Sequence, residues 1–115
     1  MESNEMAKIL CDTLAGKKAE DIIKINVTEK TVIADYFIIA SANSTTQVRA
    51  LCEYCEQAVE KAGGKVRSRE GLQEGRWAVV DFGDCILHIF NDETRLFYNI
   101  ERLWSNSANT EKIEG

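Results

Sequence analysis

Apolar side chains recur at three- and four-residue spacing in three parts of the chain, which predicts three helices. The first helix covers residues 4–15. The second follows Ser44, whose hydroxyl and a glutamine three residues later fit a capping box, and it ends at Gly63-Gly64. The third begins after Asn91 or Asp92. Its apolar positions are Leu96, Ile100, Leu103 and Trp104.

The segments between these helices carry the signals of β-strands. Residues 36–40 are apolar without alternation, which predicts a central strand that is covered on both faces. Gly83-Asp84 separates two apolar runs, as in a tight antiparallel hairpin. The predicted strands are residues 22–27, 31–42, 65–70, 77–82 and 85–90. The order of elements therefore predicts a small α/β domain with one mixed sheet of about five strands and flanking helices.

The residues that follow Trp104 show neither helical nor strand periodicity. We therefore expect one domain over residues 1–105 and a disordered or frayed C-terminal tail over residues 106–115. A chain of 115 residues is typical of a single domain, and it contains no internal repeat or linker composition.

The charge balance narrows the classes of partner. The chain has 14 Lys and Arg against 19 Asp and Glu, a net charge of -5. Unguided nucleic-acid binding draws its affinity from neutralised phosphates, so we expect little direct contact with nucleic acid. A basic protein would instead be attracted. No window is apolar enough to span a membrane, and the N-terminus does not resemble a signal peptide, so the expected location is the cytoplasm with reduced cysteines.

Candidate catalytic and metal-binding groups are few. Cys52 and Cys55 form a CxxC, but the pair lies inside the second helix on its apolar stripe, which favours ordinary buried thiols. His88 could act as a base only with a partner carboxylate, and no Ser or Cys stands in a recognisable nucleophile motif, so a hydrogen-bonded structural histidine is favoured. We expect no metal site and no cofactor.

The two aspartates of the predicted hairpin remain open to several interpretations. Asp84 suits the turn itself, because Asp tolerates the backbone angles of a tight turn. Asp81 near the end of an apolar strand needs a salt bridge, a hydrogen bond or an exposed face. A structural role and contact with a partner are equally good interpretations of Asp81. A third interpretation is that Asp81 and Asp84 together bind a metal ion.

Trp77 begins a predicted strand directly after a charged loop bracketed by glycines. Tryptophan is enriched at the centres of protein interfaces, although it is also common in cores. Glu70, Glu74, Arg76 and Asp81 surround it in the sequence. An aromatic centre with a polar rim is typical of an interface, and this pattern favours contact with another macromolecule.

Four stretches of the chain resemble the Iojap family of ribosomal silencing factors. They are ADYFIIASANSTTQV (34–48), REG (69–71), WAVVDFGDCILHIF (77–90) and RLFYNIERLW (95–104). The resemblance covers residues 4–105, nearly the whole chain, and its motifs are long and ordered. It implies a small α/β fold related to nucleotidyltransferases, and a regulatory protein without catalysis.

The resemblance also implies a function and a partner. Members of the family bind the large ribosomal subunit through its fourteenth ribosomal protein, block joining of the small subunit and repress translation; several form homodimers. Organelle relatives assist assembly of the large subunit, which is the main alternative. A nucleotidyltransferase-like enzyme is a weaker alternative, because Ala42-Asn43 replaces the Gly-Thr or Gly-Ser pair of many relatives.

Carried over by position, the resemblance assigns roles to particular residues. Leu96, Leu103 and Trp104 are expected to hold the last helix on the sheet. The residues expected to contact the partner are Glu70, Trp77, Asp81, Phe82 and Asp84.

Overall fold

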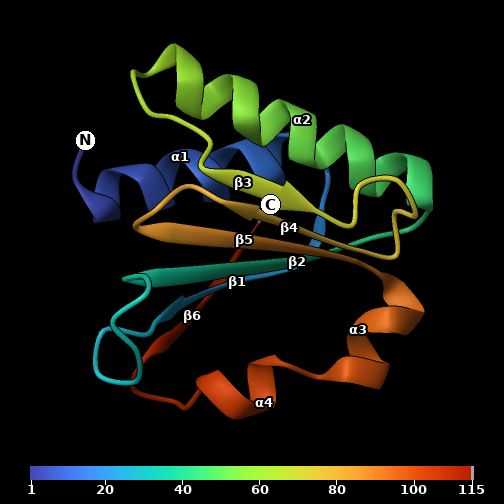
Figure 1. Ribbon diagram of the computed structural model, residues 1–115. Coiled ribbons are helices and arrows are strands. Elements are labelled where there is room, and N and C mark those ends of the chain that lie inside the picture. The colour runs from blue at the N-terminus through green and yellow to red at the C-terminus, as the bar shows by residue number, and fades with distance from the viewer. Residues whose placement is uncertain (115) are drawn as a thin grey trace.

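The computed structural model describes residues 1–114, which form one α/β domain built on a mixed six-stranded sheet (Figure 1). The helices are α1 (Ser3–Gly16), α2 (Thr45–Lys61), α3 (Asp92–Tyr98) and α4 (Glu101–Trp104). The strands are β1 (Glu20–Asn26), β2 (Tyr36–Ala42), β3 (Ser68–Glu70), β4 (Trp77–Asp81), β5 (Cys85–Asn91) and β6 (Thr110–Ile113). The α/β class expected from the sequence is confirmed.

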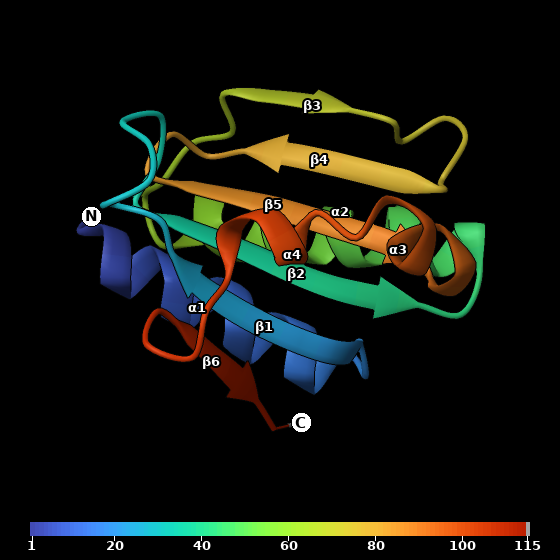
Figure 2. The ribbon, with the colours of Figure 1, turned by 90° about the horizontal axis from the view of Figure 1, so that it is seen from below.

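The sheet is ordered β3-β4-β5-β2-β1-β6, and Figure 2 shows this order face on. β2 and β5 run parallel at the centre, and their neighbours are antiparallel to them. Every β2 residue after Tyr36 is buried, as is every β5 residue before Asn91. The strand is covered by helices on both faces, which explains why residues 37–40 are apolar without alternation.

α1 and α2 cover one face of the sheet and enclose the larger hydrophobic core. Leu10, Leu14, Leu51 and Leu87 are fully buried there, and burial of each such side chain stabilises the fold by roughly 1.5–3 kcal/mol. α2 begins as the sequence predicts, because Ser44 Oγ accepts the N–H of Gln47 at 3.0 Å. The Gln47 side chain returns to the N–H of Asn43 at 2.7 Å, one residue before the cap.

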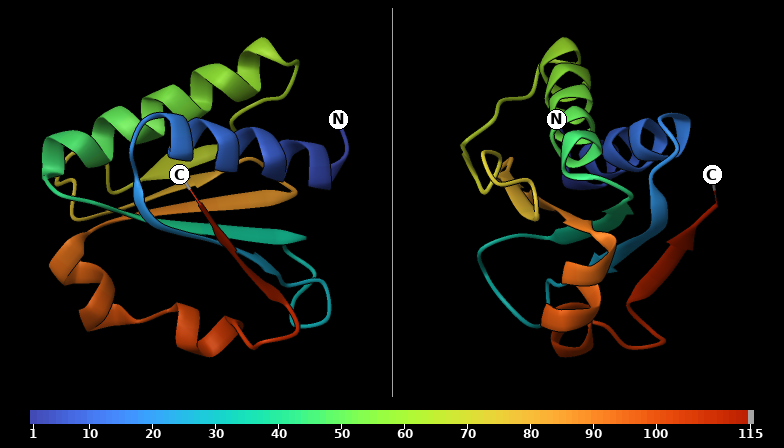
Figure 3. Two further views of the ribbon diagram at one scale, coloured as in Figure 1. Left: turned by 180° about the vertical axis from the view of Figure 1, so that it is seen from behind. Right: turned by 90° about the vertical axis from the view of Figure 1, so that its right-hand side faces the viewer.

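α3 and α4 form a thinner layer on the opposite face, as the side view in Figure 3 shows. The core beneath them is smaller and includes Phe37, Ile39 and Phe90, with Trp77 and Trp104 packed at its margin. Trp104 meets Phe37 edge-on with ring centroids 4.9 Å apart. This face of the sheet is therefore only partly covered.

Two expectations for the last predicted helix are wrong. The single last helix is broken at Asn99, which adopts a left-handed conformation with φ 45° and ends α3. Leu96 and Leu103 were expected to hold that helix on the sheet, but they are 84% and 74% exposed. Only Trp104 of the expected set packs inward.

The tail was expected to be frayed, yet Thr110–Ile113 forms β6, which pairs antiparallel with β1. The domain therefore extends beyond residue 105, and Gly115 lies outside the described residues. The strand prediction for residues 31–42 was also too long at its start. β2 begins at Tyr36, after an exposed loop that carries Val32 and Ile33.

Candidate functional site

Trp77 begins β4 on the sheet face that α3 covers, and its side chain is half-buried. Its indole stacks on Phe90 of β5 with centroids 5.0 Å apart and meets Tyr98 of α3 at 4.8 Å. The ring is thus supported by the core without being enclosed by it. A rigid, partly exposed indole is the kind of side chain that anchors protein interfaces.

His88 supports Trp77 from the next strand. The indole Nε1–H donates a hydrogen bond to His88 Nδ1 at 3.2 Å. Because Nδ1 accepts, the neutral ring carries its proton on Nε2. That nitrogen is buried and has no hydrogen-bond partner among residues 1–114. Burial lowers the pKa of His88 to about 4, so the ring is neutral at pH 7.

This arrangement confirms the structural interpretation of His88. The nitrogen that would have to accept a proton in general-base catalysis is already occupied by the indole N–H. Within the described part of the chain, neither His88 nitrogen has a carboxylate partner. The histidine instead fixes the direction of the Trp77 ring.

The β4–β5 hairpin gathers Asp81, Phe82 and Asp84 at its turn. Asp81 Oδ1 accepts the N–H of Gly83 at 2.7 Å, so the side chain that closes the turn is that of Asp81 rather than that of Asp84. The Asp84 side chain is exposed. The backbone carbonyl of Asp84 accepts a hydrogen bond from the backbone N–H of Asp35 at 2.8 Å. No ion pair within residues 1–114 involves either aspartate.

Phe82 is only 5% exposed and belongs to the core beneath α1 and α2. Its ring therefore offers little surface to a partner, and its place in the fold is structural. The alternation of β4 explains this, because Ala78, Val80 and Phe82 face the larger core while Trp77, Val79 and Asp81 face the other way.

The sequence-predicted residues do not form one compact group. Trp77 and Asp81 share a face of β4, but they are four positions apart, which is about 13 Å along a strand. Glu70 is exposed on the edge strand β3, opposite Val79. Asp81 and Asp84 therefore lie at one end of the sheet, while Trp77 lies at the other.

Two carboxylates that line a groove with Trp77, those of Glu74 and Glu93, are not among the residues predicted to contact the partner. A groove of about 520 Å³ runs between the loop before β4 and α3. Its walls include Glu74, Arg76, Trp77, Glu93, Phe97 and Tyr98. Phe97 is 82% exposed. Helical spacing in the sequence assigned Leu96 of α3 to the sheet and did not single out Phe97, the neighbouring residue that lines the groove.

Two glycines shape the loop that forms one wall of the groove. Gly71 has φ 79°, and a Cβ there would lie 2.0 Å from the carbonyl oxygen of Trp77. Gly75 has φ 71°, and its Cβ would lie 2.8 Å from Thr45. The loop thus presses against β4 and α2 at positions where only glycine fits.

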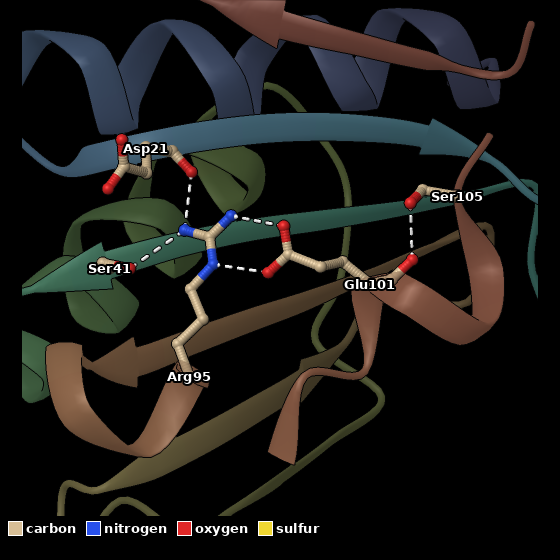
Figure 4. Close-up of polar contacts among 5 residues, drawn as sticks. All are labelled: Asp21, Ser41, Arg95, Glu101 and Ser105. Carbon is tan, nitrogen blue, oxygen red and sulfur yellow. Dashed lines mark hydrogen bonds and ion pairs between the residues drawn. The ribbon is translucent and has the colours of Figure 1, made fainter. Parts of the chain in front are cut away.

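A buried ion pair holds α3 in place (Figure 4). The guanidinium of Arg95 donates to both carboxylate oxygens of Glu101, at 2.7 and 3.1 Å. It also donates to the carbonyl of Asp21 at 2.6 Å and to Ser41 Oγ at 2.9 Å. These hydrogen bonds connect α3 and α4 to each other and to strands β1 and β2. Because Tyr98 follows Arg95 by one helical turn, this pair also fixes the ring that packs on Trp77.

The cysteines are free and buried. Burial raises the pKa of Cys52 to about 12 and that of Cys11 to about 11, so both are uncharged thiols. The expectation of ordinary buried thiols is confirmed. In the described residues, no three His, Cys, Asp or Glu side chains are grouped closely enough to hold a metal ion. None of the helices between residues 1 and 114 has the length and apolar character to cross a membrane.

Comparison with known proteins gives a consistent result. The whole chain, residues 1–115, matches a family described as "Ribosomal silencing factor during starvation". Ribosomal silencing factor RsfS of Halalkalibacterium halodurans is 32% identical over 115 residues, which cover 100% of this chain and 97% of that protein. RsfS of Bacillus subtilis is 35% identical, with 93% of this chain and 91% of that protein covered.

A relative from a eukaryote and a solved structure agree with this result. A mouse protein named "Mitochondrial assembly of ribosomal large subunit protein 1" is 33% identical over 84% of this chain and 44% of its own length. A crystal structure of a Chromobacterium violaceum protein superposes with a TM-score of 0.88 and 33% identity, covering 90% of this chain and 87% of that one. The chain belongs to the family of ribosomal silencing factors.

Proposed function

We propose that this protein binds the large ribosomal subunit through its fourteenth ribosomal protein, blocks joining of the small subunit and so represses translation. The observation that carries the proposal is the partly buried indole of Trp77, which a hydrogen bond to His88 and stacking on Phe90 orient at the surface. A preorganised aromatic anchor loses little conformational entropy on binding. The net charge of -5 favours encounter with a basic ribosomal protein over bare RNA.

The mechanism is steric. The domain measures 32 × 31 × 25 Å, so a copy seated on the joining face of the large subunit occupies space that the small subunit needs. Trp77 is the apolar anchor. Glu70 on the edge strand, and Asp81 and Asp84 at the far end of the hairpin, supply carboxylates at a distance from it. Phe82 supports the hairpin from the core and is removed from the expected contacts.

Assembly of the large subunit is the second candidate function. It is favoured by one observation, the name of the mouse relative, which describes an assembly protein. The same docking surface would serve either role, because both require contact with the large subunit. Profiles of ribosomal particles from a deletion strain separate them: immature large particles in rich medium indicate assembly, and excess joined ribosomes in starvation indicate silencing.

A subunit-joining experiment tests the proposed function. Purified small and large subunits are mixed at a fixed magnesium concentration, with the protein added either before or after mixing, and the fraction of joined ribosomes is measured on sucrose gradients. Protein added before mixing should reduce joining, while protein added afterwards should have little effect. Full joining in the presence of saturating protein would overturn the proposal.

A further inference from the structure

The groove beside Trp77 combines aromatic surface with uncompensated negative charge. Phe97 and Tyr98 of α3 form one wall, with ring centroids 5.1 Å apart, and Trp77 forms another. Phe97 is 82% exposed and is not a member of either hydrophobic core. Its ring therefore adds little to the stability of the fold and is free to contact a ligand.

The charges at the rim favour a cation. Glu74 and Glu93 face the groove against a single basic residue, Arg76. No salt bridge within residues 1–114 engages any of these three side chains. Glu70 and Asp92 are exposed sequence neighbours of lining residues, and Arg49 lies against the loop, where its guanidinium donates to the carbonyl of Gln73 at 3.3 Å.

An arginine side chain fits this combination better than other groups. Its planar guanidinium stacks on aromatic rings and pairs with carboxylates at its edge, while its methylene stem covers apolar surface. A phosphate backbone would be repelled by Glu74 and Glu93. A second copy of this chain, at net charge -5, would approach with like charge.

We propose that the groove between Trp77 and α3 receives one arginine side chain of the docking protein. This inference rests on the proposed function for the identity of the partner, but the groove's preference for a guanidinium stands on its own geometry. It adds Phe97, Tyr98, Glu74 and Glu93 to the contact surface. The aromatic rings stack on the guanidinium. The two carboxylates favour this cation over an uncharged side chain of the same shape.

The preference is measurable with a small probe. N-acetyl-arginine methylamide is titrated into the ¹⁵N-labelled protein, and the indole N–H signals of Trp77 and Trp104 are followed by NMR. The signal of Trp77 should shift saturably, with a dissociation constant on the order of millimolar, while Trp104, which packs on Phe37, stays unchanged. The citrulline analogue has the same shape without the charge and should bind at least about tenfold more weakly.

Variants locate the interaction. Glu74→Gln combined with Glu93→Gln should weaken the arginine probe by about tenfold and leave the citrulline analogue unaffected. Equal shifts with both probes, or none with arginine, would overturn the proposal. The proposal would also be overturned if sedimentation showed that the wild type is a dimer and that Phe97→Ala dissociates it. The groove would then be the binding site for a second copy of this chain.

A second measurement separates this inference from the proposed function. Binding to purified large subunits is compared for wild type, Phe97→Ala and Leu103→Ala. Both substitutions remove an exposed apolar side chain, but Leu103 does not line the groove. Phe97→Ala should weaken binding at least about tenfold, and Leu103→Ala should not. If the wild type does not bind large subunits but does bind the arginine probe, the proposed function is wrong. The preference of the groove for an arginine side chain is then still supported. If both variants bind as wild type does, the groove proposal fails.

Discussion

The indole of Trp77 and the imidazole of His88 are joined by a hydrogen bond of 3.2 Å between adjacent strands. The indole N–H can only donate a hydrogen bond, so Nδ1 of His88 must accept it. Nδ1 therefore carries no proton, and the imidazole ring is neutral. Burial keeps it neutral by lowering its pKa. The side chain proposed as the docking anchor is thus oriented by a histidine whose protonation would break the contact.

The first prediction concerns pH. The pKa of His88 is about 4 in the folded protein and 6.5 in its ordinary state, so the unfolded chain binds the extra proton between these values. Titration of His88 therefore leaves the free energy of unfolding unchanged above about pH 6.5. Between about pH 6.5 and 4 it lowers the free energy of unfolding, by about 3 kcal/mol in total. Urea denaturation at pH 7, 5.5 and 4 measures this loss.

Carboxylates also titrate in that range, so the control is His88→Gln, which removes the titrating ring. The loss of stability on acidification should be smaller in this variant. Parallel pH profiles for wild type and variant would show that His88 is not held neutral by burial.

The second prediction concerns the ion pair between Arg95 and Glu101. Arg95→Met leaves a partly buried carboxylate without its cation and should lower the free energy of unfolding by about 3 kcal/mol. The double variant Arg95→Met with Glu101→Met should recover part of that loss, because no unpaired charge remains. Chemical denaturation of the single and double variants measures both values; a double variant less stable than Arg95→Met would refute this reading.

The third prediction concerns Gly71. Gly71→Ala places a Cβ against the carbonyl oxygen of Trp77 at a positive φ, so it should destabilise the protein by about 2 kcal/mol and displace the indole. Gly16→Ala is the matched control, because nothing lies within 4 Å of its Cβ at the end of α1. Gly71→Ala should lower the melting temperature and shift the NMR signal of the Trp77 indole, whereas Gly16→Ala should do neither. Similar behaviour of the two variants would argue against the tight loop.

The fourth prediction concerns β6. Removing residues 106–115 exposes the edge of β1 and the side chains that Ile113 covers, so the free energy of unfolding should fall by about 1–2 kcal/mol. Glu111→Gln removes only the exposed ion pair to Lys24 and should change it by less than about 1 kcal/mol. An unchanged stability after the deletion would mean that β6 does not pair in solution.

β6 also illustrates what the sequence does not reveal. The central strands and the long helices are predictable because their apolar residues repeat with a clear period. Thr110–Ile113 is too short for such a pattern, and its stability comes from pairing with β1, almost ninety positions earlier in the chain. Long-range pairing of this kind leaves no local signal.

The break at Asn99 escaped prediction for a related reason. The spacing of Leu96, Ile100 and Leu103 fits one continuous helix, and nothing local distinguishes a core face from an exposed one. Tertiary contacts decide the outcome, because the Arg95–Glu101 pair closes across the break. The charged surroundings of Trp77 led to its prediction as a contact residue, whereas its groove depends on α3 and was not predictable.

The most direct test of the whole account is the affinity of Trp77→Ala for purified large ribosomal subunits, measured by co-sedimentation beside Tyr54→Ala. Tyr54 is an exposed aromatic residue on α2, on the opposite side of the sheet. Loss of the indole should weaken binding about a hundredfold, equivalent to about 2.7 kcal/mol, while Tyr54→Ala binds as wild type does. Wild-type affinity of a folded Trp77→Ala variant would contradict the central claim that this ring docks the protein on the ribosome.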